Sequence, residues 1–239
     1  MTSKQNSSVP LYAVVPAAGI GKRMESAIPK QYLIIADQAI IEYSLQPLVN
    51  HRDIKQVVVV LSQEDQWFGQ LAIAKHPKVK TVIGGCERAD SVLAGLNSLP
   101  TTGSVLVHDA ARPCLTNDDL DKLIKAQTAS CGAILASVVR DTMKRANHLG
   151  YITNTVDREL LYHALTPQLF DLDILRDTLQ AALTQQVTIT DEASAMEWGG
   201  YKVKLVAGRS DNIKVTRPED LTLAQLFLTQ QQRIKQEQQ

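Results

Sequence analysis

A loop of small and basic residues follows the first apolar segment of the chain. It reads Pro16-Ala17-Ala18-Gly19-Ile20-Gly21-Lys22-Arg23-Met24, and Pro29-Lys30 comes shortly after it. Small residues let a backbone approach a ligand closely, and consecutive N–H groups in such a turn form a concavity that binds anions. Lys22, Arg23 and Lys30 add positive charge to these backbone donors. The combination suits a triphosphate.

Two familiar phosphate-binding motifs are excluded at this loop. The dinucleotide fingerprint G-x-G-x-x-G fails because its third glycine position is Met24. The P-loop pattern fails because Pro16 replaces its first glycine and Arg23 replaces its Ser or Thr. The plain alternative is an ordinary strand-to-helix turn with solvated charges, which the three basic residues disfavour.

Two further loops carry candidate residues at the ends of predicted strands. Gly84-Gly85 either lies flat against a nucleoside or forms a tight turn, and the residues favour neither. Asp109 ends another strand, at the sheet edge where open α/β sheets bind ligands. It can accept hydrogen bonds from ribose hydroxyls or help to hold a metal, or it pairs with Arg112. The adjacent His108 is interpreted as a structural histidine.

Strand-length apolar runs alternate with amphipathic segments along the first 140 residues. The runs are apolar at nearly every position, which is typical of strands buried on both faces of a parallel sheet. They cover residues 11–15, 57–61, 79–83, 105–107 and 134–139. Helices are expected at 40–49, 65–74, 89–97 and 118–129, the last with Asn117 as N-cap. The order predicts an α/β fold, a Rossmann-like, doubly wound and mostly parallel sheet.

The pattern changes between residues 140 and 161. This stretch is polar and fits two short strands joined near residues 148–150, a β-hairpin arm. An isolated hairpin is marginal in water, so we expect the arm to serve dimerisation; a long surface loop is the alternative. Helices at 191–198 and 218–229 and a strand at 203–206 follow. We expect residues 1–239 to form a single domain that carries the arm.

The amino-acid composition limits which binding partners and which cellular compartment are expected for the protein. The 239 residues contain 25 Lys plus Arg and 25 Asp plus Glu, so the overall charge predicts no nucleic acid and no acidic membrane as partner. Three widely spaced cysteines fit reduced thiols better than a disulfide framework. No signal peptide or membrane-spanning run is recognisable. A cytoplasmic protein is therefore expected.

Several motifs in one order give the sequence a family likeness. The chain resembles the 2-C-methyl-D-erythritol 4-phosphate cytidylyltransferases of the non-mevalonate isoprenoid pathway. The resemblance implies transfer of CMP from CTP to the methylerythritol phosphate, with release of pyrophosphate and with Mg²⁺ or another divalent cation bound with CTP. Cys86 departs from the family pattern, which often has an acidic residue there. The motifs are the first loop with 29–33, and residues 84–85, 87–92, 108–113, 140–142, 155–158, 164–168, 190–194 and 212–216.

The resemblance also implies that residues 1–239 form one nucleotidyltransferase domain, and it implies roles for particular residues. Arg23 and Lys30 are assigned to the charge that develops at the α-phosphate, while Arg158 and Lys214 would hold the acceptor phosphate. Arg158 and Thr142 would reach into the neighbouring subunit, so a homodimer would share its active sites through the arm. The remaining expected substrate-binding residues are Ala17, Ala18, Gly19, Gly21, Lys22, Gly85, Ser91, Asp109, Ala110, Thr166 and Thr190.

The sequence also gives expectations about metal binding and leaves rival functions open. Mg²⁺ prefers few protein ligands, so no direct side-chain ligand is expected, with Asp109 the one candidate. Taken alone, Thr166 and Thr190 are more typical of caps or turns. The rival functions are transfer to another polyol phosphate such as ribitol 5-phosphate, a non-catalytic nucleotide-binding regulator, and a nicotinamide oxidoreductase. The missing glycine fingerprint disfavours the last, and the choice of cytosine over uracil rests on the resemblance.

Overall fold

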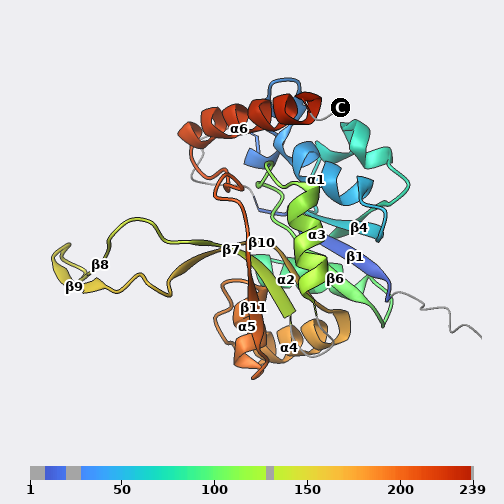
Figure 1. Ribbon diagram of the computed structural model, residues 1–239. Coiled ribbons are helices and arrows are strands. Elements are labelled where there is room, and N and C mark those ends of the chain that lie inside the picture. Colours follow the sequence, from blue (N-terminus) through green and yellow to red (C-terminus); the bar gives the residue numbers. More distant parts are fainter. Residues whose placement is uncertain (1–8, 20–27, 128–131, 238–239) are drawn as a thin grey trace, which may run out of the picture.

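The computed structural model describes residues 9–19, 28–127 and 132–237. A seven-stranded sheet runs through the molecule in the order β11-β7-β10-β6-β1-β4-β5 (Figure 1). Six strands are parallel, and β10 alone runs antiparallel to its neighbours β6 and β7. The bounds are β1 Leu11–Pro16, β4 Ile54–Leu61, β5 Val79–Ile83, β6 Ser104–Val107, β7 Gly132–Val138, β10 Tyr162–Asp171 and β11 Val203–Ala207. This confirms the predicted doubly wound fold.

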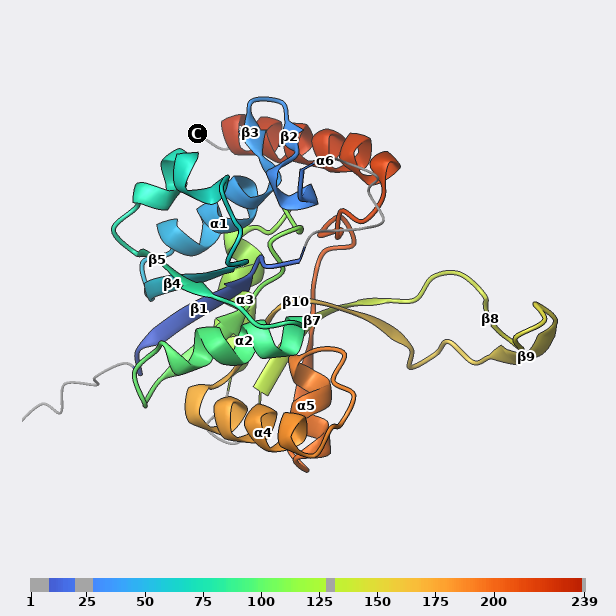
Figure 2. The ribbon, with the colours of Figure 1, turned by 180° about the vertical axis from the view of Figure 1, so that it is seen from behind.

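Helices cover both faces of the sheet, because the central strands are apolar on both sides. Ala13 of β1 packs with α1 and α3, whereas its neighbour Val14 packs with α2, α4 and α5. Figure 2 shows α2, α4 and α5 together on one side, with α1 and α6 on the other. The bounds are α1 Ile40–Asn50, α2 Arg88–Asn97, α3 Asn117–Ala126, α4 Leu172–Thr184, α5 Glu192–Trp198 and α6 Pro218–Glu237. None of the described helices is long and apolar enough to cross a membrane.

Short elements support the first loop and the segment after it. The 3₁₀ turn η2 spans Lys30–Tyr32, and the small hairpin β2 Ile34–Ile35 and β3 Gln38–Ala39 follows it. The helix expected at 65–74 is wrong: the chain forms two 3₁₀ turns, η3 Phe68–Gln70 and η4 Ala72–Lys75. The Asp65 carboxylate accepts hydrogen bonds from the amides of Trp67 and Phe68 and so starts a tight turn in place of a helix.

Three other boundaries differ from expectation. The N-cap of α3 is Thr116 rather than Asn117, because the Thr116 hydroxyl accepts from the Asp119 amide. The same helix ends at Ala126, three residues before the predicted end, and residues 128–131 lie outside the described residues. The last helix continues to Glu237 instead of stopping at residue 229.

Two of the longer elements, β10 and α4, were not anticipated at all. Strand β10 fills the centre of the sheet, and α4 starts directly after it, with Asp171 as N-cap accepting from Asp173 and Ile174 amides. The apolar pattern of β10 is interrupted by Thr166-Pro167-Gln168, which hides the strand in the sequence. Its first residue, Tyr162, pairs with Val138 at the carboxyl end of β7, and Gln168 pairs with Val107 at the carboxyl end of β6, so β10 passes the edge of the sheet where the site lies.

The arm is a two-stranded hairpin that extends away from the body (Figure 1). It comprises β8 Met143–Ala146 and β9 Ile152–Val156, paired antiparallel across a turn at Gly150 with φ +84°. This confirms the hairpin, and the alternative of a long surface loop is wrong. Large apolar side chains remain exposed along it, among them Leu149, Tyr151 and Leu160. Its role in dimerisation stays a prediction.

Candidate active site

A pocket opens at the carboxyl edge of the sheet, where the parallel strands β1, β5 and β6 end. Sheets of this type bind ligands at that edge. Loops from distant parts of the sequence meet there. The described lining comprises residues 16–19, 30–31, 85–88, Ser91, 109–111 and Lys214.

Asp109 is the electrostatic centre of the pocket. Its Oδ1 lies 3.2 Å from Nη2 of Arg88, and its Oδ2 lies 3.3 Å from Nε of Arg112 and 2.9 Å from Nζ of Lys214. Burial alone would raise the pKa of Asp109, but the charges of Arg88, Lys214 and Arg112 outweigh it and lower the pKa far below its usual value. The carboxylate is therefore ionised, and it holds three cations around one point.

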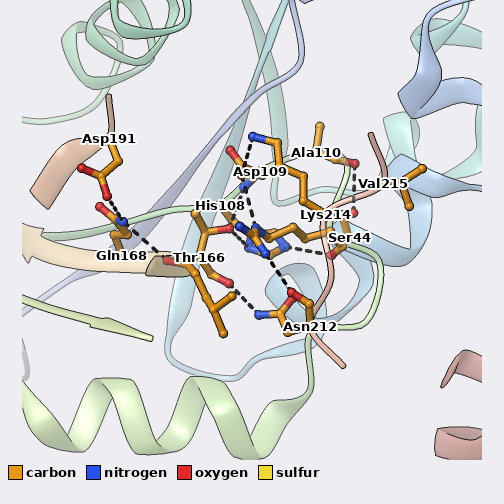
Figure 3. Close-up of polar contacts among 12 residues, drawn as sticks. Ser44, His108, Asp109, Ala110, Thr166, Gln168, Asp191, Asn212, Lys214 and Val215 are labelled. Carbon is orange, nitrogen blue, oxygen red and sulfur yellow. Dashed lines mark hydrogen bonds and ion pairs between the residues drawn. The ribbon is translucent and has the colours of Figure 1, made fainter. Parts of the chain in front are cut away.

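A buried hydrogen-bond chain fixes the backbone of Asp109 (Figure 3). The Asp109 amide donates to Oγ1 of Thr166 at 3.0 Å, and that hydroxyl lies 3.0 Å from Nδ1 of His108. Nε2 of His108 lies 3.2 Å from the Arg112 carbonyl, which can only accept, so the neutral ring carries its proton on Nε2. Burial lowers the pKa of His108 to about 4. The structural role expected for His108 is confirmed, and Thr166 is buried in the same support.

Lys214, on the loop after β11, and Lys30, on the turn η2, line the same pocket. Nδ2 of Asn212 donates to the Thr166 carbonyl at 2.8 Å, and the Val215 amide donates to the Ala111 carbonyl at 2.8 Å. Nζ of Lys30 in turn donates to the Val215 carbonyl at 2.9 Å. Two cations that are far apart in the sequence therefore line one cavity, as predicted.

Arg88 links the pocket to helix α5. Its guanidinium bonds both carboxylate oxygens of Glu192, at 2.7 and 3.1 Å, while it also contacts Asp109. Burial opposes the charge of Arg88, yet Glu192 and Asp109 raise its pKa above the usual value. Gln168 holds the start of α5, because its amide bonds Asp191 at 2.8 Å and the Ala193 amide at 2.9 Å.

Arg88 and Glu192 were not singled out in the sequence, whereas the pairing of Asp109 with Arg112 was one of the stated alternatives and is present in the structure. Arg88 and Arg112 stand shortly after strands β5 and β6, and that placement was the available signal for them. Glu192 is an acid among alanines at a helix start, which gives no sign of its distant partner.

The glycines after β5 are crowded by helix α2. A Cβ at Gly84 would lie 2.5 Å from Oγ of Ser91, and one at Gly85 would lie 2.3 Å from Cβ of Asp90. Gly85 therefore requires glycine, whereas a side chain at Gly84 would force the Ser91 hydroxyl to move. Gly85, Ser91 and the exposed Cys86 line the pocket together with Ala17, Ala18 and Gly19. Here the strand-to-helix turn is tight and also forms a wall of the cavity.

Other expected site residues lie elsewhere or were not described. Thr142 and Arg158 are exposed on the arm, where the Arg158 guanidinium bonds the Arg140 carbonyl, so this chain does not bring them into its own pocket. Thr190 is exposed, and the cap of α5 is Asp191, so a capping role for Thr190 is wrong. Gly21, Lys22 and Arg23 lie outside the described residues.

Comparison with known proteins gives one consistent result. Residues 11–230 match the family model described as 2-C-methyl-D-erythritol 4-phosphate cytidylyltransferase. A protein of that name from Shewanella amazonensis is 56% identical over 97% of this chain and 99% of the relative. One from Vibrio cholerae is 55% identical over 91% and 95%.

Solved structures agree with these relatives. A crystal structure of 4-diphosphocytidyl-2C-methyl-D-erythritol synthase has a TM-score of 0.79 and 37% identity, and the match covers 92% of this chain and all 100% of that one. The Francisella tularensis 2-C-methyl-D-erythritol 4-phosphate cytidylyltransferase has a TM-score of 0.79 and 30% identity, over 91% and 99%.

Proposed function

The chain belongs to the 2-C-methyl-D-erythritol 4-phosphate cytidylyltransferase family, and from this premise we propose how its pocket works. The enzyme transfers CMP from CTP to 2-C-methyl-D-erythritol 4-phosphate and releases pyrophosphate, a step in the biosynthesis of isoprenoid precursors. The observation that carries the proposal is the meeting of Lys30 and Lys214 beside Asp109 in one pocket.

Charge determines the mechanism. The acceptor phosphate is already an anion at neutral pH, so its oxygen can attack the α-phosphorus of CTP without a strong general base. The barrier is the approach of two anions while negative charge builds on the α-phosphate and the leaving pyrophosphate. Positioning and charge stabilisation dominate reactions of this kind. The buried neutral His108, enclosed in its own hydrogen bonds, has no part in proton transfer.

The two lysines have different tasks in this scheme. Lys30, beside the first loop, stabilises the charge that develops around the α-phosphorus, together with Arg23 from that loop. Lys214 binds the acceptor phosphate and holds it in line. Its side chain is 36% exposed while paired with Asp109, so it reaches the ligand without losing its partner.

The nucleoside fits the other end of the pocket. Gly85 and Ser91 line this end, where the Gly85 backbone and the Ser91 hydroxyl would contact the pyrimidine. The small residues 17–19 would let the phosphates approach the backbone. Asp109 and Ala110 line the same pocket and would bind the ribose hydroxyls.

The protein groups favour a divalent cation held by the phosphates of CTP. No cluster of three or more metal-binding side chains occurs in the part of the chain that the structure describes. Both oxygens of Asp109 are in ion pairs, which leaves that carboxylate poorly suited to ligation. Mg²⁺ typically keeps few protein ligands beside substrate phosphates. When bound, it would neutralise phosphate charge.

The arm supplies the remaining phosphate contact in a homodimer. Its apolar side chains Leu149, Tyr151 and Ile152 are exposed, which favours packing on a second copy. Arg158 and Thr142 on one arm would then complete the acceptor site of the neighbouring subunit.

Pyrophosphate release with a panel of substrates tests the proposed function. The wild type should release pyrophosphate with CTP and 2-C-methyl-D-erythritol 4-phosphate, and far less with UTP or with ribitol 5-phosphate. Faster release with ribitol 5-phosphate would transfer the assignment to another polyol phosphate. Tight binding of CTP without release from any pair would make the protein a nucleotide-binding regulator.

A further inference from the structure

Gln31 is a buried polar residue that the mechanism above does not use. Its side-chain amide nitrogen donates to two backbone carbonyls of the first loop, Ala17 at 2.7 Å and Gly19 at 3.1 Å. Only 4% of the residue is exposed. A side-chain NH₂ group has two N–H donors, and both donors of Gln31 bond this loop.

These two bonds determine which way the loop amides face. In a planar trans peptide the C=O of one residue and the N–H of the next point in opposite directions. Since the Ala17 carbonyl points at Gln31, the Ala18 N–H points away from it. That N–H has no hydrogen-bond partner among the described residues, and Ala18 lines the pocket. The Ala17 amide is held separately by the Val60 carbonyl at 2.8 Å.

The same turn presents Lys30 to the pocket. Three successive residues of a 3₁₀ turn point in three directions, and here Lys30 reaches the Val215 carbonyl while Gln31 reaches the first loop. Tyr32 enters the core, where it bonds Asp65 and stacks on Trp67 with ring centroids 5.6 Å apart. Gln31 thus joins a rigid turn that carries the lysine to the loop that carries the amides.

We propose that Gln31 is a positioning residue for the cytidylyl transfer, holding the first loop against the Lys30 turn so that loop amide and ammonium act on the same phosphate. The inference rests on the proposed function. Supporting residues of this kind typically change activity by about 10- to 100-fold when they are removed from metal sites, and we expect a loss of that order here.

Gln31→Met tests this role, because methionine keeps the size of the side chain and removes both donors. We expect kcat for pyrophosphate release to fall about 10- to 100-fold, while KM for the sugar phosphate stays within about threefold. Gln31→Glu, which keeps the shape and replaces the donor nitrogen by an oxygen, should lose at least as much and takes the place of Gln31→Met if that variant does not fold.

Gln231→Met is the matched control. Gln231 is also a buried glutamine whose amide donates to a backbone carbonyl, that of Cys114 at 3.0 Å, but it lies outside the pocket lining. It should lose comparable stability in urea unfolding and keep its kcat. If Gln31→Met remains folded and keeps kcat within about threefold, or if both variants lose activity in proportion to stability, the role of Gln31 is refuted.

A double-mutant cycle with Lys30→Ala tests the connection to the lysine. Groups that act as a unit are non-additive, so the double variant should retain more activity than the product of the two single losses allows. Fully multiplicative losses would contradict the connection. Inactivity of the wild type on CTP and the sugar phosphate would refute the proposed function, whereas an active wild type with an equally active Gln31→Met refutes the role of Gln31 only.

Discussion

The ammonium group of Lys214 lies 2.9 Å from Oδ2 of Asp109. This ion pair connects the loop after β11 to the end of β6, the strand beside β1 in the sheet. Asp109 is nearly buried, whereas Lys214 keeps about a third of its side chain in contact with solvent. The single negative charge of Asp109 is shared among Lys214, Arg88 and Arg112. The ion pair therefore fixes Lys214 at the mouth of the pocket, and Lys214 keeps positive charge that can attract an incoming anion.

Lys214→Ala should damage use of the sugar phosphate more than use of CTP. Removal of one preorganised cation typically costs roughly a hundred- to thousandfold, and we expect this loss in kcat/KM for the sugar phosphate. Steady-state kinetics with each substrate varied in turn will measure it. Lys204→Ala, an exposed lysine on β11, is the control and should behave like wild type. A larger effect on KM for CTP than on the acceptor would contradict the assignment.

Glu192→Ala should destabilise the fold. Glu192 is 2% exposed and forms a two-bond ion pair with Arg88, and removing one partner of a buried pair leaves the other without compensation. Because Arg88 keeps Asp109, we expect a loss of about 3 kcal/mol in the free energy of unfolding, at the lower end for such pairs. Urea unfolding will measure the loss. Glu197→Ala, exposed on the same helix, should stay within about 0.5 kcal/mol of wild type.

His108 should make stability depend on pH between about 6.5 and 4. Burial lowers its pKa to about 4 in the folded protein, while an unfolded histidine titrates near 6.5. Below about pH 6.5 the histidine is protonated in the unfolded chain but stays neutral in the folded chain. The free energy of unfolding therefore falls as the pH is lowered. From pH 7 to pH 5 this amounts to about 2 kcal/mol. The stability that Asp109 contributes is lost only at lower pH, because the loss begins where the unfolded carboxylate takes up a proton, near its ordinary pKa of 3.8.

Urea unfolding of His108→Gln over that pH range checks this origin. The variant should lose the slope between pH 7 and pH 5, even if it is less stable throughout. His148→Gln, on the exposed turn of the arm, should keep the slope of wild type. Parallel curves for His108→Gln and wild type would show that another group is responsible.

Mixed dimers test the shared active site. If Arg158 acts in the neighbouring subunit, a heterodimer of inactive Lys30→Ala and inactive Arg158→Ala chains contains one intact site. Random exchange of subunits should then restore about a quarter of the wild-type activity. Activity that stays at the level of the separate variants after exchange would place Arg158 outside the neighbouring site.

The sequence predicted the elements that carry an uninterrupted pattern. β1, β4, β6 and β7 are buried and largely apolar on both faces, whereas the edge strand β5 also carries the exposed Lys80 and Thr81. Each of the five was found within a few residues of its bounds. β10 was missed because the polar residues Thr166 and Gln168 interrupt its apolar pattern. Both are buried in the structure, where Thr166 bonds His108 and Gln168 bonds Asp191. The helix expected at 65–74 failed because the Asp65 side chain competes locally for backbone amides.

The candidate site was predictable where strand ends carry basic or small residues. Lys30, Lys214, Asp109 and Gly85 were all named from their position and likeness, and all four line the pocket. The ion pair of Arg88 with Glu192 was not, because its members are 104 residues apart and a single charge at a helix start has no period to mark it. Gln31 was missed for a different reason: its side chain bonds backbone carbonyls, which have no signature in the sequence.

Turnover and CTP binding of Lys30→Ala test the central claim most directly. Convergent cations should stabilise the charge that develops as the two phosphates react, more than they stabilise bound CTP. We therefore predict that kcat falls roughly a hundred- to thousandfold, while the Kd for CTP measured by calorimetry changes by less than about tenfold. Lys122→Ala, exposed on α3, should match wild type in both. An unchanged kcat in Lys30→Ala would contradict the account.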